Sequence, residues 1–83
     1  MKVLLAASIL LVACAQAHAS CRSEVGERQA NLYVTQCREV SPATRPPCNT
    51  ANACALIISE IKRGCELLKT DAPAYCAQYM GSR

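Results

Sequence analysis

Cysteine is the residue type in this chain with the most chemistry available to it. The 83 residues include seven cysteines, one histidine and three tyrosines, and no other aromatic residue. A thiol can hold a metal ion, act as a nucleophile or pair as a disulfide, and spacing distinguishes these uses. After Cys21 the successive cysteines are separated by fifteen, ten, five, ten and ten residues, so no Cys-x-x-Cys pair occurs. We therefore expect no metal site, no thioredoxin-like redox motif and no c-type haem attachment.

Catalysis by Cys65 is the second use to consider. Lys62 and Arg63 precede this residue, and nearby cations lower the pKa of a thiol. A nucleophilic thiol also needs a base, and the single histidine, His18, lies in an N-terminal segment that we expect to be removed. The chain has no glycine-rich phosphate loop, and its carboxylates form no acid–base motif. These carboxylates are Glu24, Glu27, Glu39, Glu60, Glu66 and Asp71. We therefore expect a protein that is not an enzyme and holds no cofactor.

The N-terminal segment has the features of a secretory signal peptide. Lys2 is followed by an uncharged run from Val3 to Ala15, and Ala17-His18-Ala19 fits the small-residue rule for cleavage. The run of about 13 residues is shorter than the about 20 that a membrane-spanning helix needs. We expect cleavage after Ala19, so that residues 1–19 are removed and residues 20–83 form a cysteine-rich helical domain.

A second export route remains open in the same segment. Leu11-Val12-Ala13-Cys14 resembles a bacterial lipobox, in which the cysteine is lipidated and becomes the new N-terminus. The signal would then be residues 1–13, and a lipid on Cys14 would tether the protein to a membrane. Otherwise Cys14 is a small apolar residue of the signal peptide. Either route removes Cys14 from the pool of pairing thiols.

The six remaining cysteines indicate a disulfide framework. Their number is even and their density in a short exported chain is that of a disulfide scaffold. Three bridges at about 2–4 kcal/mol each would be comparable to the net stability of a typical domain. The predicted disulfide residues are Cys21, Cys37, Cys48, Cys54, Cys65 and Cys76.

The periodicity predicts an all-α fold, a small three-helix domain stapled by disulfides. A long helix over residues 23–40 places Tyr33, Cys37 and Val40 on one face. Three prolines between Ser41 and Pro47 make this stretch an extended, stiff connector. Asn49 or Thr50 is expected to cap the next helix.

The core helix has the clearest pattern in the sequence. Its apolar stripe recurs at spacings of four, three, four and three, with Leu56 and Ile57 widening it, whereas Glu60 and Glu66 fall outside it and are expected to face solvent. Gly64 inside this pattern predicts the close approach of a neighbouring backbone. The stripe consists of Cys54, Ile58, Ile61, Cys65 and Leu68.

A short third helix is expected after the core helix. Thr70 or Asp71 can cap it, and Pro73 suits its first turn because the missing N–H is not needed there. The predicted helix covers residues 75–80.

Antiparallel packing of the first two helices would divide the cysteines between two ends of the domain. The eleven positions from Cys54 to Cys65 span about 16 Å of helix, far more than a disulfide bridges, so at least one bridge must join the two ends. The pairing we predict is Cys21–Cys65, Cys37–Cys54 and Cys48–Cys76.

The functional expectation is an exported protein with a structural or accessory binding role in the bacterial envelope or periplasm. The net charge of +3 comes from interspersed basic and acidic residues, so no nucleic-acid binding is expected. We expect a monomer whose partner is a protein or envelope component, with membrane contact only if Cys14 is lipidated. The alternative is a released toxin, effector or inhibitor that acts by surface binding. The candidate binding loop is Thr44, Arg45, Pro46 and Pro47, because loops on rigid scaffolds often carry contacts.

Overall fold

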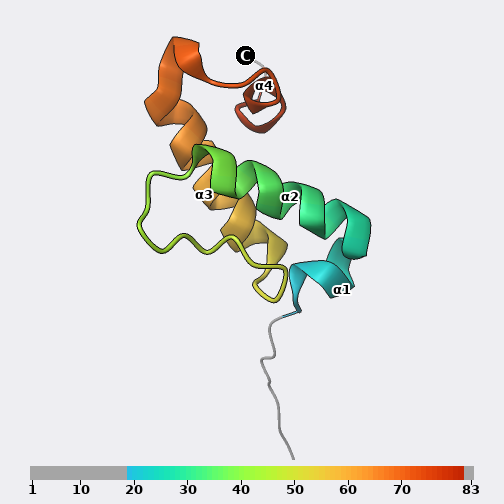
Figure 1. Cartoon of the computed structure of the whole chain (residues 1–83). Coiled ribbons are helices and arrows are strands. Elements are labelled where there is room, and N and C mark those ends of the chain that lie inside the picture. Colours follow the sequence, from blue (N-terminus) through green and yellow to red (C-terminus); the bar gives the residue numbers. More distant parts are fainter. Residues whose placement is uncertain (1–18, 82–83) are drawn as a thin grey trace, which may run out of the picture.

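The computed structural model describes residues 19–81 and confirms the all-α fold, with no strand among these residues (Figure 1). The predicted signal peptide up to residue 18, including Cys14, lies outside the described residues. The elements are α1 (Cys21–Val25), α2 (Glu27–Val40), α3 (Cys54–Leu68), the 3-10 turn η1 (Lys69–Asp71) and α4 (Cys76–Tyr79).

The predicted first helix is two helices separated at Gly26. This glycine has a φ of 92°, a backbone conformation that favours glycine, and it redirects the chain between α1 and α2. Helix α1 begins earlier than expected, because the Oγ of Ser20 caps it by accepting a hydrogen bond from the backbone N–H of Ser23 at 3.1 Å. The break lets α1 turn towards the start of α3, where the N–H of Cys21 donates to the carbonyl of Asn52 at 2.6 Å.

The core lies where α2 crosses α3. Ile57 and Ile61 of α3 are completely buried, and α2 contributes Val34 and Val40 to the same cluster. The predicted close approach at Gly64 is confirmed, because a Cβ atom there would lie 2.2 Å from the carbonyl oxygen of Val40. The absence of a side chain at this position therefore lets the end of α2 rest on α3.

The expected antiparallel packing of the two long helices is wrong. The N-terminus of α3 lies beside α1, where Cys21 and Cys54 are bridged, and Gly64 near its C-terminal end meets the end of α2. Residues 41–53 run back between these two points, so both helices progress from the α1 side of the molecule (Figure 1). The physical reason is the extended connector, whose three prolines prevent a tight helical hairpin and let the chain return along α2.

All six cysteines of the domain are paired, but the predicted connectivity is wrong in every pair. Cys21 pairs with Cys54, Cys37 with Cys48, and Cys65 with Cys76, with Cα–Cα distances of 4.3, 5.5 and 5.6 Å. Two of the bridges join a helix to the segment that directly follows it in the chain, Cys48 to α2 and Cys76 to α3. Because the helices do not pack antiparallel, no bridge has to cross the molecule.

The buried face of α3 is rotated around the helix relative to the predicted apolar stripe, so that it is centred closer to Gly64. Ile58 and Leu68 are only half-buried and Leu56 is 49% exposed, whereas Glu60 is buried. The rotation follows from the crossing, since α2 packs where the smallest residue of α3 lets it come closest. Val25 of α1 and Leu32 of α2 are also exposed.

The predicted helix caps are also corrected. Helix α3 begins at Cys54, after Ala53 and without a side-chain cap, and Asn49 instead closes the preceding turn by accepting from the N–H of Ala51 at 2.7 Å. The segment after α3 forms η1 at the predicted cap positions, so α4 starts only at Cys76 and is shorter than expected.

Candidate binding surface

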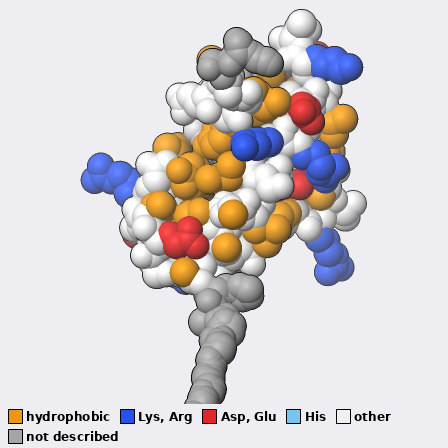
Figure 2. All heavy atoms as spheres, turned by 180° about the vertical axis from the view of Figure 1, so that it is seen from behind, with side chains coloured by type: hydrophobic (Ala, Val, Ile, Leu, Met, Phe, Trp, Pro, Cys, Tyr) orange, Lys and Arg blue, Asp and Glu red, His pale blue; other side chains and the backbone are white. Residues whose placement is uncertain are grey.

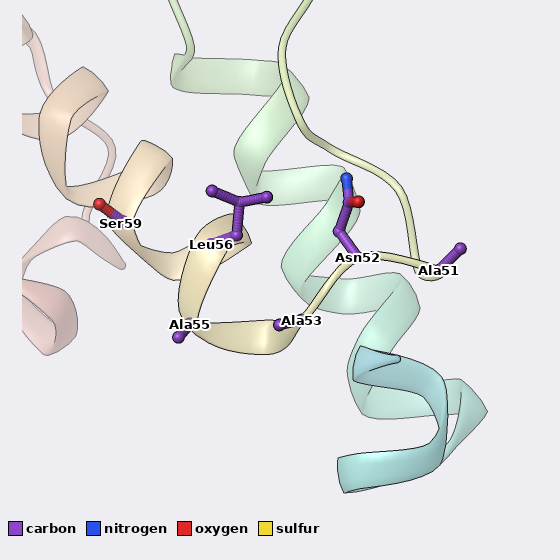
Figure 3. A pocket seen from close by; sticks show the side chains of 6 residues that line it. All are labelled: Ala51, Asn52, Ala53, Ala55, Leu56 and Ser59. Carbon is purple, nitrogen blue, oxygen red and sulfur yellow. The ribbon is translucent and has the colours of Figure 1, made fainter. Parts of the chain in front are cut away.

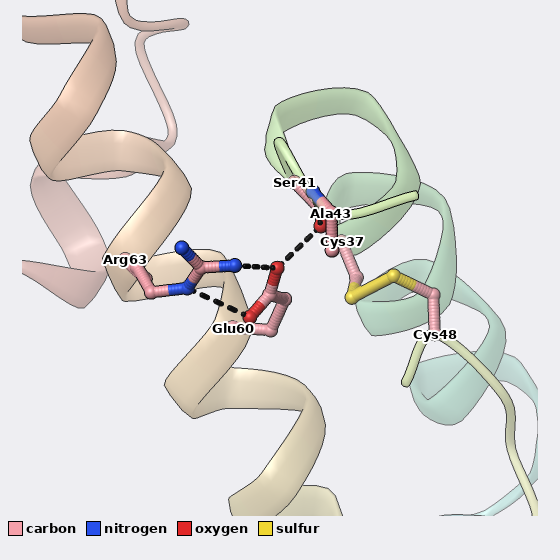
Figure 4. A network of polar contacts seen from close by, with 6 residues as sticks. All are labelled: Cys37, Ser41, Ala43, Cys48, Glu60 and Arg63. Carbon is pink, nitrogen blue, oxygen red and sulfur yellow. Dashed lines mark hydrogen bonds and ion pairs between the residues drawn. A yellow bond between two sulfur atoms is a disulfide. The ribbon is translucent and has the colours of Figure 1, made fainter. Parts of the chain in front are cut away.

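A buried carboxylate joins α3 to the connector. Glu60 accepts hydrogen bonds from Arg63, from Nε at 3.1 Å and from Nη2 at 3.0 Å, and a further hydrogen bond from the hydroxyl of Ser41 (Figure 4). The hydroxyl oxygen of Ser41 in turn accepts from the N–H of Ala43 at 3.1 Å. The expectation that Glu60 faces solvent is therefore wrong, whereas Glu66 is exposed as predicted.

The electrostatics of this cluster favour an ionised Glu60. Hydrogen bonds from Arg63 and from Ser41 lower the pKa of the Glu60 carboxyl, and they outweigh burial, which acts in the opposite direction. Three hydrogen-bond donors compensate the charge, so Glu60 fastens the start of the connector to α3.

The predicted binding loop presents its first two residues to solvent. Thr44 and Arg45 are exposed, whereas Pro46 and Pro47 are half-buried. The loop is fixed at its C-terminal side by the Cys37–Cys48 bridge and by the carbonyl of Pro47, which accepts from the side-chain amide of Asn52 at 3.0 Å. On its N-terminal side Ser41 is hydrogen-bonded to Glu60. Its accessible chemistry is therefore one hydroxyl and one guanidinium on a pinned backbone.

A groove between α2, α3 and α4 brings together more groups than the loop does. It has a volume of about 390 Å³ and combines three side-chain amides, two phenols, one ammonium group and two aliphatic side chains. A small number of convergent polar groups on an apolar wall is typical of a recognition site. The groove is lined by Gln29, Leu32, Tyr33, Gln36, Ile58, Lys62, Gln78, Tyr79 and Gly81.

The tyrosines of this region hold α4 against α2. Tyr79 donates to the side-chain oxygen of Gln36, and its ring meets that of Tyr33 edge to face, with centroids 6.3 Å apart. Tyr75 donates to Glu39 at 2.5 Å. Burial raises the pKa of both Tyr75 and Tyr79, with a further contribution from Glu39 at Tyr75 and from Tyr33 at Tyr79. Both phenols therefore stay neutral near neutral pH and act as hydrogen-bond donors.

Sequence reasoning did not find this groove. Its residues come from three helices, and the Cys65–Cys76 bridge, which the predicted pairing did not contain, ties α4 to α3. The available signal was the helical spacing of Gln29, Leu32 and Tyr33, which places polar and apolar side chains side by side on one face of the predicted helix.

A second hollow lies at the start of α3 and has a different chemistry. Its volume is about 600 Å³, and none of its six lining side chains carries a charge (Figure 3). Leu56 projects there with 49% of its surface exposed. The lining residues are Ala51, Asn52, Ala53, Ala55, Leu56 and Ser59.

Charged side chains are dispersed over the visible surface. The face opposite to that of Figure 1 has apolar groups at its centre, with basic and acidic side chains scattered around them and no continuous basic stripe (Figure 2). Within residues 19–81 no three histidine, cysteine or acidic side chains gather as a metal cluster.

No helix in the described part of the chain combines the length and apolar character needed to cross a membrane.

Comparison of the chain with protein-family models, curated proteins and solved structures returned no match.

Proposed function

We propose that this chain is an exported accessory binding protein of the bacterial envelope or periplasm, and that it binds its partner through the groove between α2, α3 and α4. The observation that carries the proposal is the pairing of all six domain cysteines. Disulfides persist in oxidising compartments and stabilise small domains whose apolar core is limited.

The groups of the groove support binding without catalysis. The phenol of Tyr79 is already hydrogen-bonded to Gln36, and the buried carboxylate outside the groove, Glu60, is already satisfied by Arg63 and Ser41. The domain thiols are oxidised, so none serves as a nucleophile. What remains accessible in the groove donates and accepts hydrogen bonds.

The mixture of groups favours a protein partner that presents an extended segment. Gln36 and Tyr79 bond to each other, and the amides of Gln29 and Gln78 with the phenol of Tyr33 can match the alternating N–H and C=O groups of a peptide backbone. Lys62 adds one site for a carboxylate. Leu32 at the groove is 47% exposed and offers an apolar contact beside these polar groups.

Fractionation combined with thiol alkylation tests the proposed location. The full chain expressed in a bacterium should be recovered from the periplasm or membrane, and the native protein should take up no alkylating reagent until it is reduced. Uptake of two or more alkyl groups without reductant would contradict the disulfide framework. Recovery mainly from the culture fluid would favour a released toxin, effector or inhibitor instead.

Site-specific crosslinking tests the groove itself. A photoreactive amino acid at Leu32 should give a discrete adduct in cells, whereas the same group at Leu67 serves as the control because Leu67 is exposed outside the groove. Substitution of Tyr33 by alanine should remove the adduct at Leu32, and Thr35→Ala, an exposed change on the same helix, should preserve it. Adducts of equal yield at both leucines would contradict a binding role for the groove.

A further inference from the structure

The uncharged hollow at the start of α3 lies where the N-terminal segment joins the domain. Cys21 is bridged to Cys54 and hydrogen-bonded through its N–H to the carbonyl of Asn52, one of the residues that line the hollow. Arg22 is held to the same turn, because its N–H donates to the carbonyl of Thr50 at 3.1 Å. Any chain that precedes Ser20 therefore starts at this side of the molecule.

The length of the preceding segment limits what can lie beside the hollow. The uncharged run ends at Ala15, and five residue steps join it to Ser20. At about 3.3–3.6 Å per step the link spans at most about 18 Å, which is less than the about 22 Å length of a 15-residue helix such as α3. A membrane that holds this run therefore lies within about 18 Å of Ser20, and a membrane that holds a lipid on Cys14, six steps away, lies within about 22 Å. Either attachment keeps the first turns of α3 near the membrane, because Cys54 is bridged to Cys21, whereas it sets no such limit on the last turns of α3.

The chemistry of this corner fits a lipid surface. The six residues that line the hollow are uncharged, and Leu56 projects from the first turns of α3 (Figure 3). Arg22 stands beside them, with Nη1 donating to the Oγ1 of Thr50 at 3.0 Å. A leucine beside a guanidinium suits the boundary between acyl chains and anionic headgroups.

We propose that the hollow around Leu56 faces the lipid bilayer while the domain is attached to its N-terminal segment. The inference rests on the proposed export and concerns the chain before cleavage after Ala19, or the chain with a lipid on Cys14, because a membrane must hold residues 1–15 or that lipid. One leucine and three alanines bind lipid weakly by themselves, and the short link raises their effective concentration at the surface. We therefore expect this lipid contact only while the N-terminal segment holds the domain at the membrane.

Depth-dependent fluorescence quenching tests this orientation. The full chain is reconstituted in vesicles of phosphatidylcholine and phosphatidylglycerol that carry nitroxide lipids, with a fluorescent amino acid at position 56 or at position 67. Leu67 is the matched control, because it is an exposed leucine (59%) near the opposite end of the same helix. We expect quenching to be several-fold stronger at position 56, and replacement of Arg22 by glutamate to weaken it.

The outcomes separate the two proposals. A full chain that does not stay with the vesicles overturns the proposed lipid contact, because that contact needs the N-terminal segment to hold the domain at the membrane, and the proposed export is then decided by the fractionation described above. A full chain that stays with the vesicles but is quenched equally at both positions, or more strongly at position 67, overturns the orientation and leaves the proposed export standing. Both labels replace exposed side chains, so circular dichroism should show an unchanged fold in each variant.

Discussion

The two segments that follow the long helices are closed by disulfides of the same spacing but have different structures. Cys37–Cys48 and Cys65–Cys76 each join residues eleven positions apart. The first segment contains three prolines and runs extended back along α2. The second contains one proline, forms η1 and leads into α4, which packs on α2 through its tyrosines.

The difference shows that cysteine spacing determines where a segment is fastened, whereas the residues between the cysteines determine its conformation. Proline removes N–H donors and disfavours helical dihedrals in the residue before it, so the first segment stays extended. The buried carboxylate of Glu60 holds the first segment, and the second is held by the phenol of Tyr75, which donates to Glu39 near the end of α2. The two can therefore be perturbed separately.

The largest effect on the free energy of unfolding is expected where α2 crosses α3. Ile61→Ala removes a completely buried side chain between α2 and α3 and should cost about 2–5 kcal/mol of the free energy of unfolding. Lys62→Ala, an exposed neighbour on α3, should change it by less than about 0.5 kcal/mol. Urea denaturation of both variants measures this, and equal effects would mean that the core is assigned wrongly.

Removal of each short bridge compares the two segments directly. The double variants C37A/C48A and C65A/C76A open loops of equal length, so loop-closure entropy predicts a loss of about 3 kcal/mol for each. Thermal unfolding monitored by circular dichroism gives both values under identical conditions. A difference much larger than about 1 kcal/mol would show that native contacts of the segments, and not loop closure, dominate.

A smaller and pH-dependent effect on stability is expected from the Glu60 carboxylate, which holds the first segment through Ser41. Glu60→Gln keeps the shape but removes the charge, and should destabilise the domain by about 1–2 kcal/mol near neutral pH. Because the pKa of Glu60 is lowered on folding, its contribution is complete above the ordinary glutamate value and is lost as the pH falls through the lowered value. The free energies of unfolding of wild type and variant should therefore converge in acid. A difference that stays constant with pH would contradict an ionised Glu60 in the folded protein.

The smallest effect is expected from the contact that holds the second segment. Tyr75→Phe removes the hydrogen bond to Glu39 and should cost about 0.5–1.5 kcal/mol. Hydrogen exchange should become faster in α4 and remain unchanged in the connector. Equal acceleration in both segments would mean that they unfold as one unit.

The fold class, the existence of α3 and the close approach at Gly64 could be predicted because each depends on local spacing, whereas the start of α3 was predicted too early. Helical periodicity identified α3, and a glycine inside it indicated a neighbouring backbone. The pairing of the cysteines could not be predicted in the same way, because it depends on the direction of the connector. An assumed antiparallel hairpin placed Cys54 at the wrong end of the domain and led to three incorrect pairs.

The candidate binding surface was less accessible to sequence reasoning than the fold. The groove needs Gln29 and Tyr33 of α2 to meet Tyr79 of α4, residues that are far apart in the chain. The buried position of Glu60 was also missed, since a helical stripe ranks residues by hydrophobicity and does not show that Ser41 and Arg63 can satisfy a carboxylate.

The Cys21–Cys54 bridge has a consequence for biosynthesis, because it encloses the whole Cys37–Cys48 loop in the sequence. On the proposed export route the chain emerges from its N-terminus, so Cys21 meets the oxidising compartment first. Pairing in the order of emergence would join Cys21 to Cys37 and Cys48 to Cys54, and only the Cys65–Cys76 bridge would be native. Thiol–disulfide exchange must then break these two non-native bridges and pair their four cysteines again. The yield of correctly folded protein in the cell therefore depends on disulfide isomerisation as well as on oxidation.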